Sequence, residues 1–286
     1  MSQPIITLTA DWGVNNYFAG MVKGRLLRNI PGAVIVDISL DIDSYDRQQA
    51  AFIVRQACRE FPQGTIHIID VDSVARKRAT THYPLQQPAA SGEARQAEEK
   101  AYSGYKHIIV LSGGQYYITA DNGIIGVALG SNIEKAVVLN TGERVSSFAC
   151  FDYYCDAAAL LARGVPMEEL GQPHGIAVGD MSAIHLTDSS VLNTTVAYVD
   201  TYGNAYLNIS HKQFEQIRAG RRFRAVVHEN IITTVSTDYT SNNSNGLMLT
   251  VSATGQMQLV LLHRSANQLY NLEKGNQVRF VFRDNE

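Results

Sequence analysis

The sequence has little of what marks a small secreted protein or a membrane protein. Its 286 residues include only three cysteines, an odd number that does not suggest a disulfide framework. No apolar run approaches the roughly 20 residues that span a bilayer, and the first residues show neither a basic segment nor a cleavable apolar stretch. We therefore expect a protein of the reducing cytoplasm that makes no membrane contact.

Excess charge of either sign is also lacking. Lys and Arg number 24 against 27 Asp and Glu, and the isoelectric point lies near 6.2. A nucleic-acid-binding protein normally shows a basic excess, so we expect no nucleic-acid partner. Residues of the hydrophobic class make up 45% of the chain, which excludes disorder as its main state and suffices for a sizeable core.

Several catalytic templates are missing. There is no glycine-rich phosphate loop of the Walker or Rossmann type, and no G-x-S-x-G nucleophile elbow. The eight histidines are scattered, and Cys150 and Cys155 have no further zinc ligands beside them. The sequence therefore predicts neither a metal site nor a cofactor.

What is present begins with alternating strand-like and helix-like segments. Short β-branched runs predict strands, and apolar residues at helical spacing predict the helices between them. The expected elements are strands at 5–9, 33–38, 65–71, 108–111 and 116–119, and helices at 17–29, 46–60 and 156–163. This order predicts an α/β domain over residues 1–178, with a mostly parallel sheet and helices on both faces. A polar segment at 85–106 interrupts it and is interpreted as a surface insertion.

The pattern changes near residue 180. Residues 179–190 are interpreted as a linker, and short strands follow at 191–199, 223–227, 247–252, 257–262 and 277–282. Asn- and Gly-rich turns separate them. Residues 191–286 are therefore expected to form a smaller antiparallel β barrel or sandwich.

Acidic residues follow two of the predicted parallel strands. In open α/β sheets ligands bind outside the carboxyl ends of the strands, and Asp11 there could accept hydrogen bonds from a vicinal diol such as that of ribose. A carboxylate that merely caps the next helix is the alternative. Asp72 has Arg76 and Arg78 close behind it, so it could orient a water, or it could form an exposed ion pair.

The segment Asp200–Asn204 of the second domain is similarly ambiguous. It reads as a hairpin turn, or as a loop that presents Asp200, Tyr202 and Asn204 toward a purine. Asp121, Asn122 and Gly123 form a strong turn signal that structure alone would explain.

Taken in order, these fragments resemble the S-adenosyl-L-methionine (SAM) hydroxide adenosyltransferases, the SAM hydrolases, whose superfamily includes a SAM-dependent fluorinase and chlorinase. The resemblance covers nearly the whole chain. Its fragments are residues 6–13 (T-L-T-T-D-F-G in the family), 17–24 (Y-V-G-x-M-K-G), 36–52 (V-D-I-T-H, then D-x-x-x-A-A-F), 61–67 (F-P-x-G-T-V-H), 121–123 (D-N-G) and 200–209 (D-x-F-G-N-x-x-x-N-I).

The resemblance implies a homotrimer in which SAM lies between the first domain of one subunit and the second domain of its neighbour. It implies an in-line displacement at C5′ of the ribose, in which hydroxide attacks and neutral methionine leaves, so that adenosine and methionine form. No metal is implied. The chemistry depends on holding nucleophile, carbon and sulfur in line in a site that admits one water.

Individual residues carry over unevenly. Asp11 matches the aspartate that grips the ribose diol, and Tyr45 stands where the halogenases pack an aromatic ring on the substrate. Asp200 and Asn204 match residues that hold the amino-acid or adenosine end. Further substrate-binding candidates are Cys150, which offers no clear halide-binding hydroxyl, Tyr202, and the segment Arg264, Ser265 and Ala266 at a possible adenine-edge loop.

The catalytic group departs from the family pattern. After the third strand the hydrolases show D-P-G-V-G-S-x-R, and here Asp72 persists while Arg78 or Arg76 stands in for the arginine. The hydrolases also carry F-H-G-R-D, and here Ala149 replaces its histidine and Phe151 its arginine. The sequence therefore leaves three hypotheses: an active SAM hydrolase, a SAM- or adenosine-binding sensor or regulator that has lost hydrolysis, and a scaffold without a nucleoside. The retained Asp11 and the Asp200–Asn204 stretch count against the third.

Overall fold

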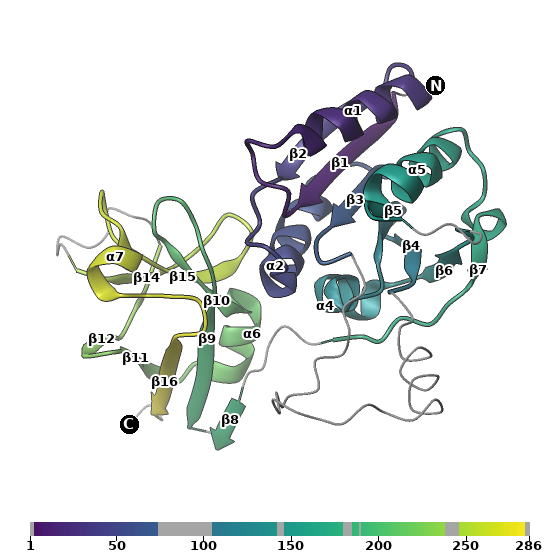
Figure 1. The fold of residues 1–286 in the computed structure, drawn as a ribbon. Coiled ribbons are helices and arrows are strands. Elements are labelled where there is room, and N and C mark those ends of the chain that lie inside the picture. The colour runs from purple at the N-terminus through teal and green to yellow at the C-terminus, as the bar shows by residue number, and fades with distance from the viewer. Residues whose placement is uncertain are drawn as a thin grey trace, which may run out of the picture. The chain divides into compact units, whose positions relative to one another are not determined.

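The chain divides into two compact units, Met1–Gly179 and Asp180–Glu286 (Figure 1). The computed structural model describes residues 3–73, 105–141, 146–179, 185–188, 190–237 and 246–283. Arg76, Arg78 and nearly all of the predicted insertion at 85–106 lie outside these residues. The first unit is α/β and the second is built mainly from antiparallel strands, so the predicted fold class is confirmed.

The first unit has a seven-stranded sheet in the order β2-β1-β3-β5-β4-β6-β7. Its strands are β1 (Ile5–Ala10), β2 (Val34–Ser39), β3 (Ile66–Asp70), β4 (His107–Ser112), β5 (Gln115–Ala120), β6 (Lys135–Leu139) and β7 (Gly171–Pro173). Its helices are α1 (Tyr17–Asn29), α2 (Arg47–Ala57), α4 (Ile124–Leu129) and α5 (Cys155–Ala162), with a π-helical turn, η3 (Cys150–Tyr154), leading into α5 and short 3₁₀ turns at Cys58–Glu60, Gly130–Asn132 and Met167–Glu169.

The sheet is parallel where β2, β1, β3 and β5 adjoin, and antiparallel from β5 to β7. The change of direction has a local cause. Gly113 and Gly114 form the two-residue turn between β4 and β5, with φ of 59° and 72°, and both angles suit a tight hairpin. A two-residue connection can join only antiparallel neighbours.

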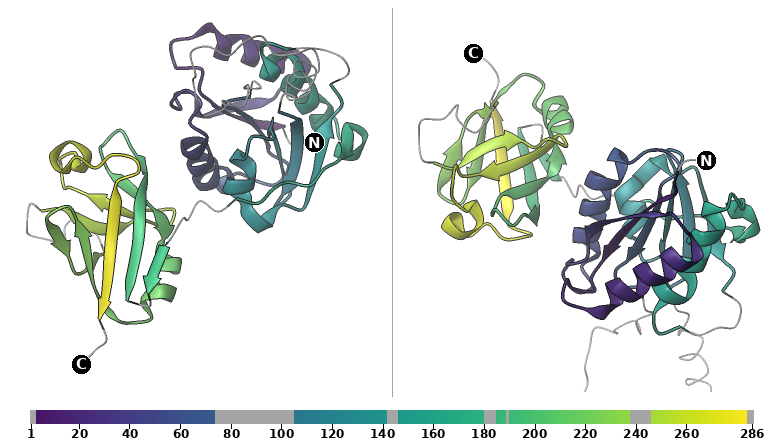
Figure 2. Two further views of the ribbon diagram at one scale, coloured as in Figure 1. Left: turned by 60° about the horizontal axis from the view of Figure 1, so that its bottom comes forward. Right: turned by 90° about the horizontal axis from the view of Figure 1, so that it is seen from above.

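Helices cover both faces of this sheet, as Figures 1 and 2 show. Helices α1 and α5 pack together on one face, while α2 packs against α4 on the other. The face toward α1 and α5 carries alternate residues of the central strands, among them Ile6, Leu8, Ile66 and Ile68, all buried. This face-by-face alternation fixes which side chains at the ends of the strands point toward which helices.

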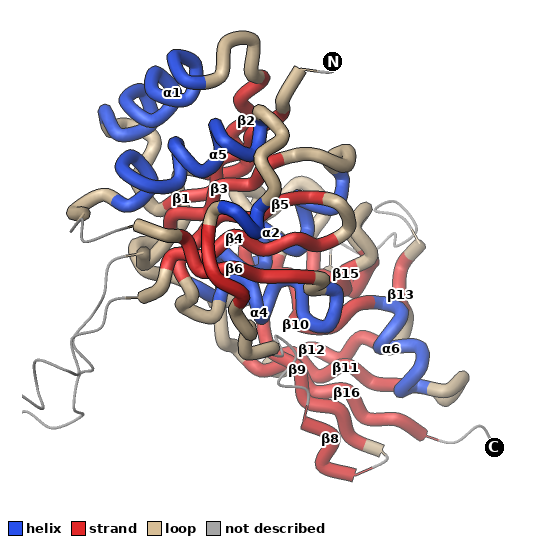
Figure 3. The backbone as a smooth tube through the Cα atoms, turned by 90° about the vertical axis from the view of Figure 1, so that its right-hand side faces the viewer, coloured by secondary structure: helices blue, strands red, loops and turns tan. Residues whose placement is uncertain are grey.

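The second unit has a nine-stranded sheet that curls on itself, with strands drawn in red in Figure 3. The order is β12-β11-β16-β9-β10-β15-β14-β13, with β8 on β9. The elements are β8 (His185–Asp188), β9 (Val191–Val199), β10 (Ala205–Ser210), α6 (His211–Arg218), β11 (Arg222–Val227), β12 (Asn230–Ile232), β13 (Val235–Ser236), β14 (Met248–Val251), β15 (Gln256–Val260), α7 (Ala266–Tyr270) and β16 (Gln277–Arg283). All neighbours are antiparallel except β13 and β14.

The second unit has its own core. Phe214 of α6 is completely buried, and its ring lies 5.0 Å from that of Phe280 and 5.2 Å from that of Phe223. Strand β8 lies within the predicted linker at 179–190 and pairs with β9. Pairing with a longer neighbour orders a segment whose own sequence carries only a weak strand signal.

Candidate functional site

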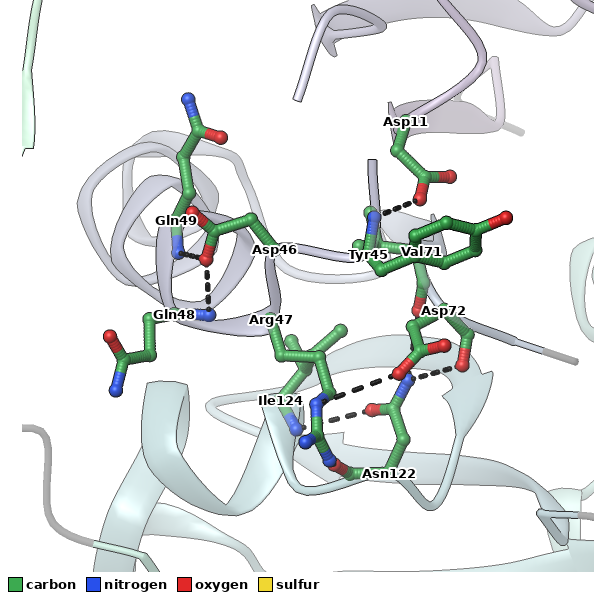
Figure 4. A network of polar contacts seen from close by, with 10 residues as sticks. All are labelled: Asp11, Tyr45, Asp46, Arg47, Gln48, Gln49, Val71, Asp72, Asn122 and Ile124. Carbon is green, nitrogen blue, oxygen red and sulfur yellow. Dashed lines mark hydrogen bonds and ion pairs between the residues drawn. The ribbon is translucent and has the colours of Figure 1, made fainter. Parts of the chain in front are cut away.

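The carboxyl ends of the parallel strands bring several predicted site residues together (Figure 4). Asp11 follows β1, Tyr45 lies in the loop after β2, and Asp72 follows β3. Neighbouring parallel strands end at the same edge of a sheet, so residues far apart in the chain meet there. The structure thus brings Asp11, Tyr45 and Asp72 to one edge of the first unit's sheet, while their roles stay predictions.

Asp11 and Tyr45 make a direct contact. The backbone N–H of Tyr45 donates a hydrogen bond to Asp11 Oδ2 over 2.8 Å. Tyr45 has φ of 67°, an uncommon angle for a residue other than glycine, and its side chain is 58% exposed. The other oxygen, Asp11 Oδ1, accepts no hydrogen bond from any residue that the structure describes. Asp11 therefore presents an anchored carboxylate with one oxygen available to a ligand.

Asp72 lies in a second polar group formed with Arg47 and Asn122. Arg47 Nε is 3.6 Å from Asp72 Oδ2, and Arg47 Nη1 donates to the carbonyl of Asn122 over 2.8 Å. The Asn122 amide donates to the carbonyls of Val71 and Asp72 over 2.8 and 3.0 Å. Asp72 itself is buried, with φ of 48°. The group therefore holds the Asp72 carboxylate beside the Arg47 guanidinium.

Sequence reasoning missed Arg47 as the cation beside Asp72. Arg47 is the first residue of α2, and Asp46 caps that helix by accepting the backbone N–H groups of Gln48 and Gln49. An Asx cap fixes where a helix begins and therefore where its first side chain points. The sequence signal that could have found Arg47 was the cap at Asp46. A helix that begins at the carboxyl edge of the sheet places its first residue next to the site.

Ala149 and Cys150 lie at the turn that leads into α5, on the face of the sheet that α1 and α5 cover. Ala149 is 4% exposed and Cys150 is completely buried. Burial raises the pKa of the Cys150 thiol well above its usual range, with the neighbouring Cys155 adding to the rise. A thiol in that state is neutral and a poor nucleophile. Cys150 is thus part of the core of the first unit. Its contact with substrate stays a prediction.

A carboxylate that the sequence reasoning did not single out lies close by. Asp70 is the last residue of β3, is 4% exposed, and accepts a hydrogen bond from Trp12 Nε1 at Oδ2 over 2.8 Å. Burial raises its pKa to about 6. The alternation along β3 would have placed it on the α1 and α5 face with Ile66 and Ile68, but its tryptophan partner is set by tertiary structure.

The second unit has a pocket of its own, with a volume of about 460 Å³. It brings together four predicted binding residues with three that were not predicted. The lining residues are Tyr202, Asn204, Leu261, Leu262, His263, Arg264 and Ser265. Tyr202 is 79% exposed and Arg264 lines the same pocket, and an aromatic ring or a guanidinium is a surface on which a flat ring can stack.

Asp200 organises the loop next to this pocket. Its Oδ1 accepts the backbone N–H groups of Tyr202 and Asn204 over 3.0 and 2.9 Å. Its Oδ2 accepts from the Asn204 amide over 3.0 Å and from the Tyr206 hydroxyl over 3.2 Å. Those four hydrogen bonds occupy both oxygens, so Asp200 shapes the turn that carries Tyr202 and Asn204.

The two loops of the pocket touch at Gly203. This residue has φ of 81°, and a Cβ built there would lie 2.0 Å from Ser265 Oγ. Only glycine satisfies both the angle and the close approach. Ser265 caps α7 by accepting the N–H of Gln268, and Ala266, the first residue of α7, is completely buried. Ala266 thus supports the loop from within and does not line the pocket.

Within the described part of the chain, no three His, Cys, Asp or Glu side chains are grouped so that they could hold a metal ion. No described helix is long and apolar enough to cross a membrane.

The first unit is thus an α/β domain with polar groups at the carboxyl edge of its sheet, where such sheets bind ligands. The second is a β unit with a pocket of its own. Comparison with known families makes the class specific. Residues 6–83 and 98–171 match the SAM hydroxide adenosyltransferase N-terminal domain, and residues 194–279 match the C-terminal domain of the same family. The chain belongs to the SAM hydroxide adenosyltransferase family, which confirms the resemblance seen in the sequence.

Named relatives carry two activities. The chain is 23% identical to the (R)-S-adenosyl-L-methionine hydrolase of Methanocaldococcus jannaschii, over 97% of this chain and 96% of that protein. It is 24% identical to the hydrolase of the same name from Salinispora arenicola, over 97% and 98% of the two chains. It is 26% identical to a fluorinase of Actinoplanes sp. (strain N902-109), over 76% and 75%.

The fold also has a solved counterpart. An uncharacterized conserved protein of Thermotoga maritima superposes with a TM-score of 0.77 at 20% identity, over 97% of this chain and 99% of that chain. At such identity the likeness concerns the fold alone.

Proposed function

We propose that this protein binds SAM and that it hydrolyses SAM to adenosine and methionine. The observation that carries the proposal is Asp11, whose carboxylate is anchored at the tip of β1 by the Tyr45 N–H and keeps one oxygen for a ligand. A carboxylate oxygen in that position is suited to a ribose diol. Membership of the family and relatives named as SAM hydrolases support the choice of ligand.

We assign the remaining binding residues by their positions. The Tyr45 ring packs on the substrate beside Asp11, and Cys150 forms part of the wall. Tyr202, Asn204, Arg264 and Ser265 hold the adenosine or amino-acid end, with Asp200 and Ala266 shaping their loops. In this proposal residues 1–178 form the SAM-binding domain.

The proposed reaction is a displacement at C5′. A water oxygen forms a bond to C5′ as the bond from C5′ to sulfur breaks, and the bonding pair stays on sulfur to give neutral methionine. The proton of the water passes to Asp72, which is held by Arg47. Arg78 or Arg76 stays the predicted catalytic arginine. A positive sulfonium leaves without needing an acid, so positioning and a base suffice.

One observation favours a second candidate, a SAM- or adenosine-binding sensor or regulator without turnover. Ala149 stands at the place of the family histidine and is buried among apolar neighbours. A methyl group neither accepts a proton nor polarises water. Losing a general base costs on the order of 10²–10⁴ in rate. Binding residues are retained in either case, so the two candidates differ only in turnover.

A paired experiment separates them. SAM is incubated with the protein and the products are resolved by chromatography, while calorimetry measures SAM binding on the same preparation. Adenosine and methionine above the buffer rate support the hydrolase, and binding without product supports the regulator. A halide-dependent product would point to halogenase chemistry, and absence of binding would refute both candidates.

The family resemblance also leads us to propose a homotrimer. Light scattering coupled to size-exclusion chromatography should give three times the chain mass of 31.4 kDa. A monomeric mass at micromolar concentration would refute it. A reducing cytoplasm is the proposed location and fits the three free thiols at Cys58, Cys150 and Cys155.

A further inference from the structure

One hydrogen bond joins the end of β3 to the residue that follows Asp11. Trp12 is the only tryptophan of the chain, and its indole Nε1 donates to Asp70 Oδ2 over 2.8 Å. Ala10 and Asp70 are register partners at the ends of β1 and β3. The hydrogen bond between Trp12 and Asp70 therefore ties the turn after β1 to the neighbouring strand β3, next to Asp11.

The indole has a second partner, and the residue after Trp12 is also held. Its ring meets the Phe148 ring edge-on, with centroids 5.5 Å apart and an interplanar angle of 79°. The next residue, Gly13, donates its backbone N–H to the carbonyl of Leu40 over 2.8 Å. Trp12 is thus fixed by β3 and by the segment before η3, and the backbone that follows it is fixed by the loop after β2. A turn held in this way leaves little freedom to the adjacent residue.

We propose that Asp70 is a positioning residue, which fixes Trp12 and through it holds the Asp11 carboxylate in the orientation that binds the nucleoside sugar. This inference rests on the proposed function, because it assigns Asp70 a task toward the ligand of Asp11. Asp70 has no role in the mechanism above. Placing a carboxylate in an apolar core is costly unless it is hydrogen-bonded, and here the bond goes to the residue next to Asp11.

The charge state of Asp70 makes the role measurable. Burial raises the pKa of Asp70 to about 6, hydrogen bonds from Ser73 and Trp12 oppose the rise, and the charge of Asp11 adds to it. Among the described residues, the other titratable groups that interact with it are Cys150 and Tyr154 of η3, whose pKa values burial raises well above the usual range, so both are neutral. Asp70 is therefore charged above about pH 6, where it is the stronger acceptor for the Trp12 N–H.

The first experiment is a pH titration of tryptophan fluorescence on the intact protein. Because Trp12 is the single tryptophan, its emission should change in one transition centred near pH 6. The transition should disappear in Asp70→Asn and remain in Glu168→Gln, a control at an exposed ion pair. A flat wild-type profile, or a transition that survives in Asp70→Asn, would overturn the pairing on which the proposal depends.

The second experiment measures adenosine and SAM affinity by calorimetry at about pH 8 and about pH 5. Asp70→Ala should bind roughly tenfold more weakly than wild type at about pH 8, because it leaves the indole without an acceptor. Asp70→Asn keeps an acceptor oxygen, so its loss should be smaller, and the part of the pH dependence centred near 6 should vanish. Circular dichroism verifies that each variant is folded.

The outcomes separate the two proposals. If wild type binds and a folded Asp70→Ala variant binds equally well, the positioning role is overturned and the proposed function stands. If Asp70→Ala fails to fold, the comparison of Asp70→Asn with wild type across pH decides, and an unchanged pH profile overturns the role. If wild type binds neither ligand, the proposed function is refuted and the positioning role with it, whatever the fluorescence shows.

Discussion

At the scale of single residues, Asp11 has one oxygen that accepts the Tyr45 N–H and a second that accepts no hydrogen bond from the described residues. Replacing it with alanine should weaken adenosine binding by about 1–3 kcal/mol, because charge-assisted hydrogen bonds to the diol are lost. Calorimetry measures the change. Asp37→Ala removes an equal charge from an exposed ion pair with Lys23 and should leave affinity unaltered. An Asp11→Ala variant that binds as well as wild type would contradict the sugar assignment.

Asp70 makes a prediction about stability as well as about binding. Its pKa is raised to about 6 in the folded protein against 3.8 for an unperturbed Asp, so the folded state holds the proton more tightly. Its contribution to stability is present below about pH 4 and is lost as the pH rises through 6. Two pKa units correspond to about 3 kcal/mol.

Asp70→Asn should therefore raise the free energy of unfolding at about pH 8 and change it little at about pH 4, because wild type carries the buried charge only at the higher pH. Urea unfolding at both pH values measures the difference. An equal effect at both would mean that Asp70 does not titrate in this range.

Residues at strand ends could be predicted, and their partners could not. Asp11 and Asp72 follow short apolar runs, and that is enough to place them at one edge of a parallel sheet. Arg47 matters because it lies beside Asp72, about 25 residues later in the sequence. Asp70 matters because it accepts a hydrogen bond from Trp12, 58 residues earlier. Such pairs follow from packing and register, which one sequence does not reveal.

At the scale of elements, the contact between the Asp200–Asn204 turn and α7 sets the pocket of the second unit. Gly203→Ala should destabilise the protein by more than 1 kcal/mol, on the order expected for strain plus a clash with Ser265. It should also weaken adenosine binding, because the loop must move.

Gly220 supplies a matched control for this prediction. Its φ of 75° is close to that of Gly203, but nothing lies within 4 Å of a Cβ built there. Gly220→Ala should therefore show only the strain of a left-handed angle and should keep full affinity. Thermal unfolding and calorimetry compare the two variants, and equal behaviour would show that the close approach to Ser265 is unimportant.

Among the elements, the long and strongly periodic ones were predictable. Helix α1 was expected at 17–29 and begins and ends there, because Asn16 caps it and Pro31 with Gly32 follows it. Helix α6 was missed because only Phe214 of its eight residues is buried. Its signal was the capping box of Ser210 and Gln213, which a search for apolar periodicity does not detect.

At the scale of the whole molecule, each unit has a separate core. Phe214→Ala in the second unit should cost about 3–5 kcal/mol, since it removes the ring that packs on Phe223, Phe280 and Phe282. Circular dichroism should then show an early unfolding phase. Trp12 belongs to the first unit, so tryptophan fluorescence should keep the wild-type midpoint.

The reciprocal change tests the same idea from the other side. Leu26→Ala truncates a completely buried residue of the first unit and should move the fluorescence midpoint. If Phe214→Ala moved fluorescence and circular dichroism together, the two units would unfold as a single cooperative body.

The three thiols all lie in the first unit, at Cys58, Cys150 and Cys155, and all are buried. Burial raises the pKa of Cys58 to about 12 and that of Cys150 well above its usual range, and all three sulfurs are buried, so a maleimide finds no exposed sulfur in the folded state. Alkylation must therefore wait for transient opening of the first unit. The rate of alkylation, followed by mass spectrometry, therefore reports how often the first unit opens. A nucleoside bound at Asp11 should lower this rate.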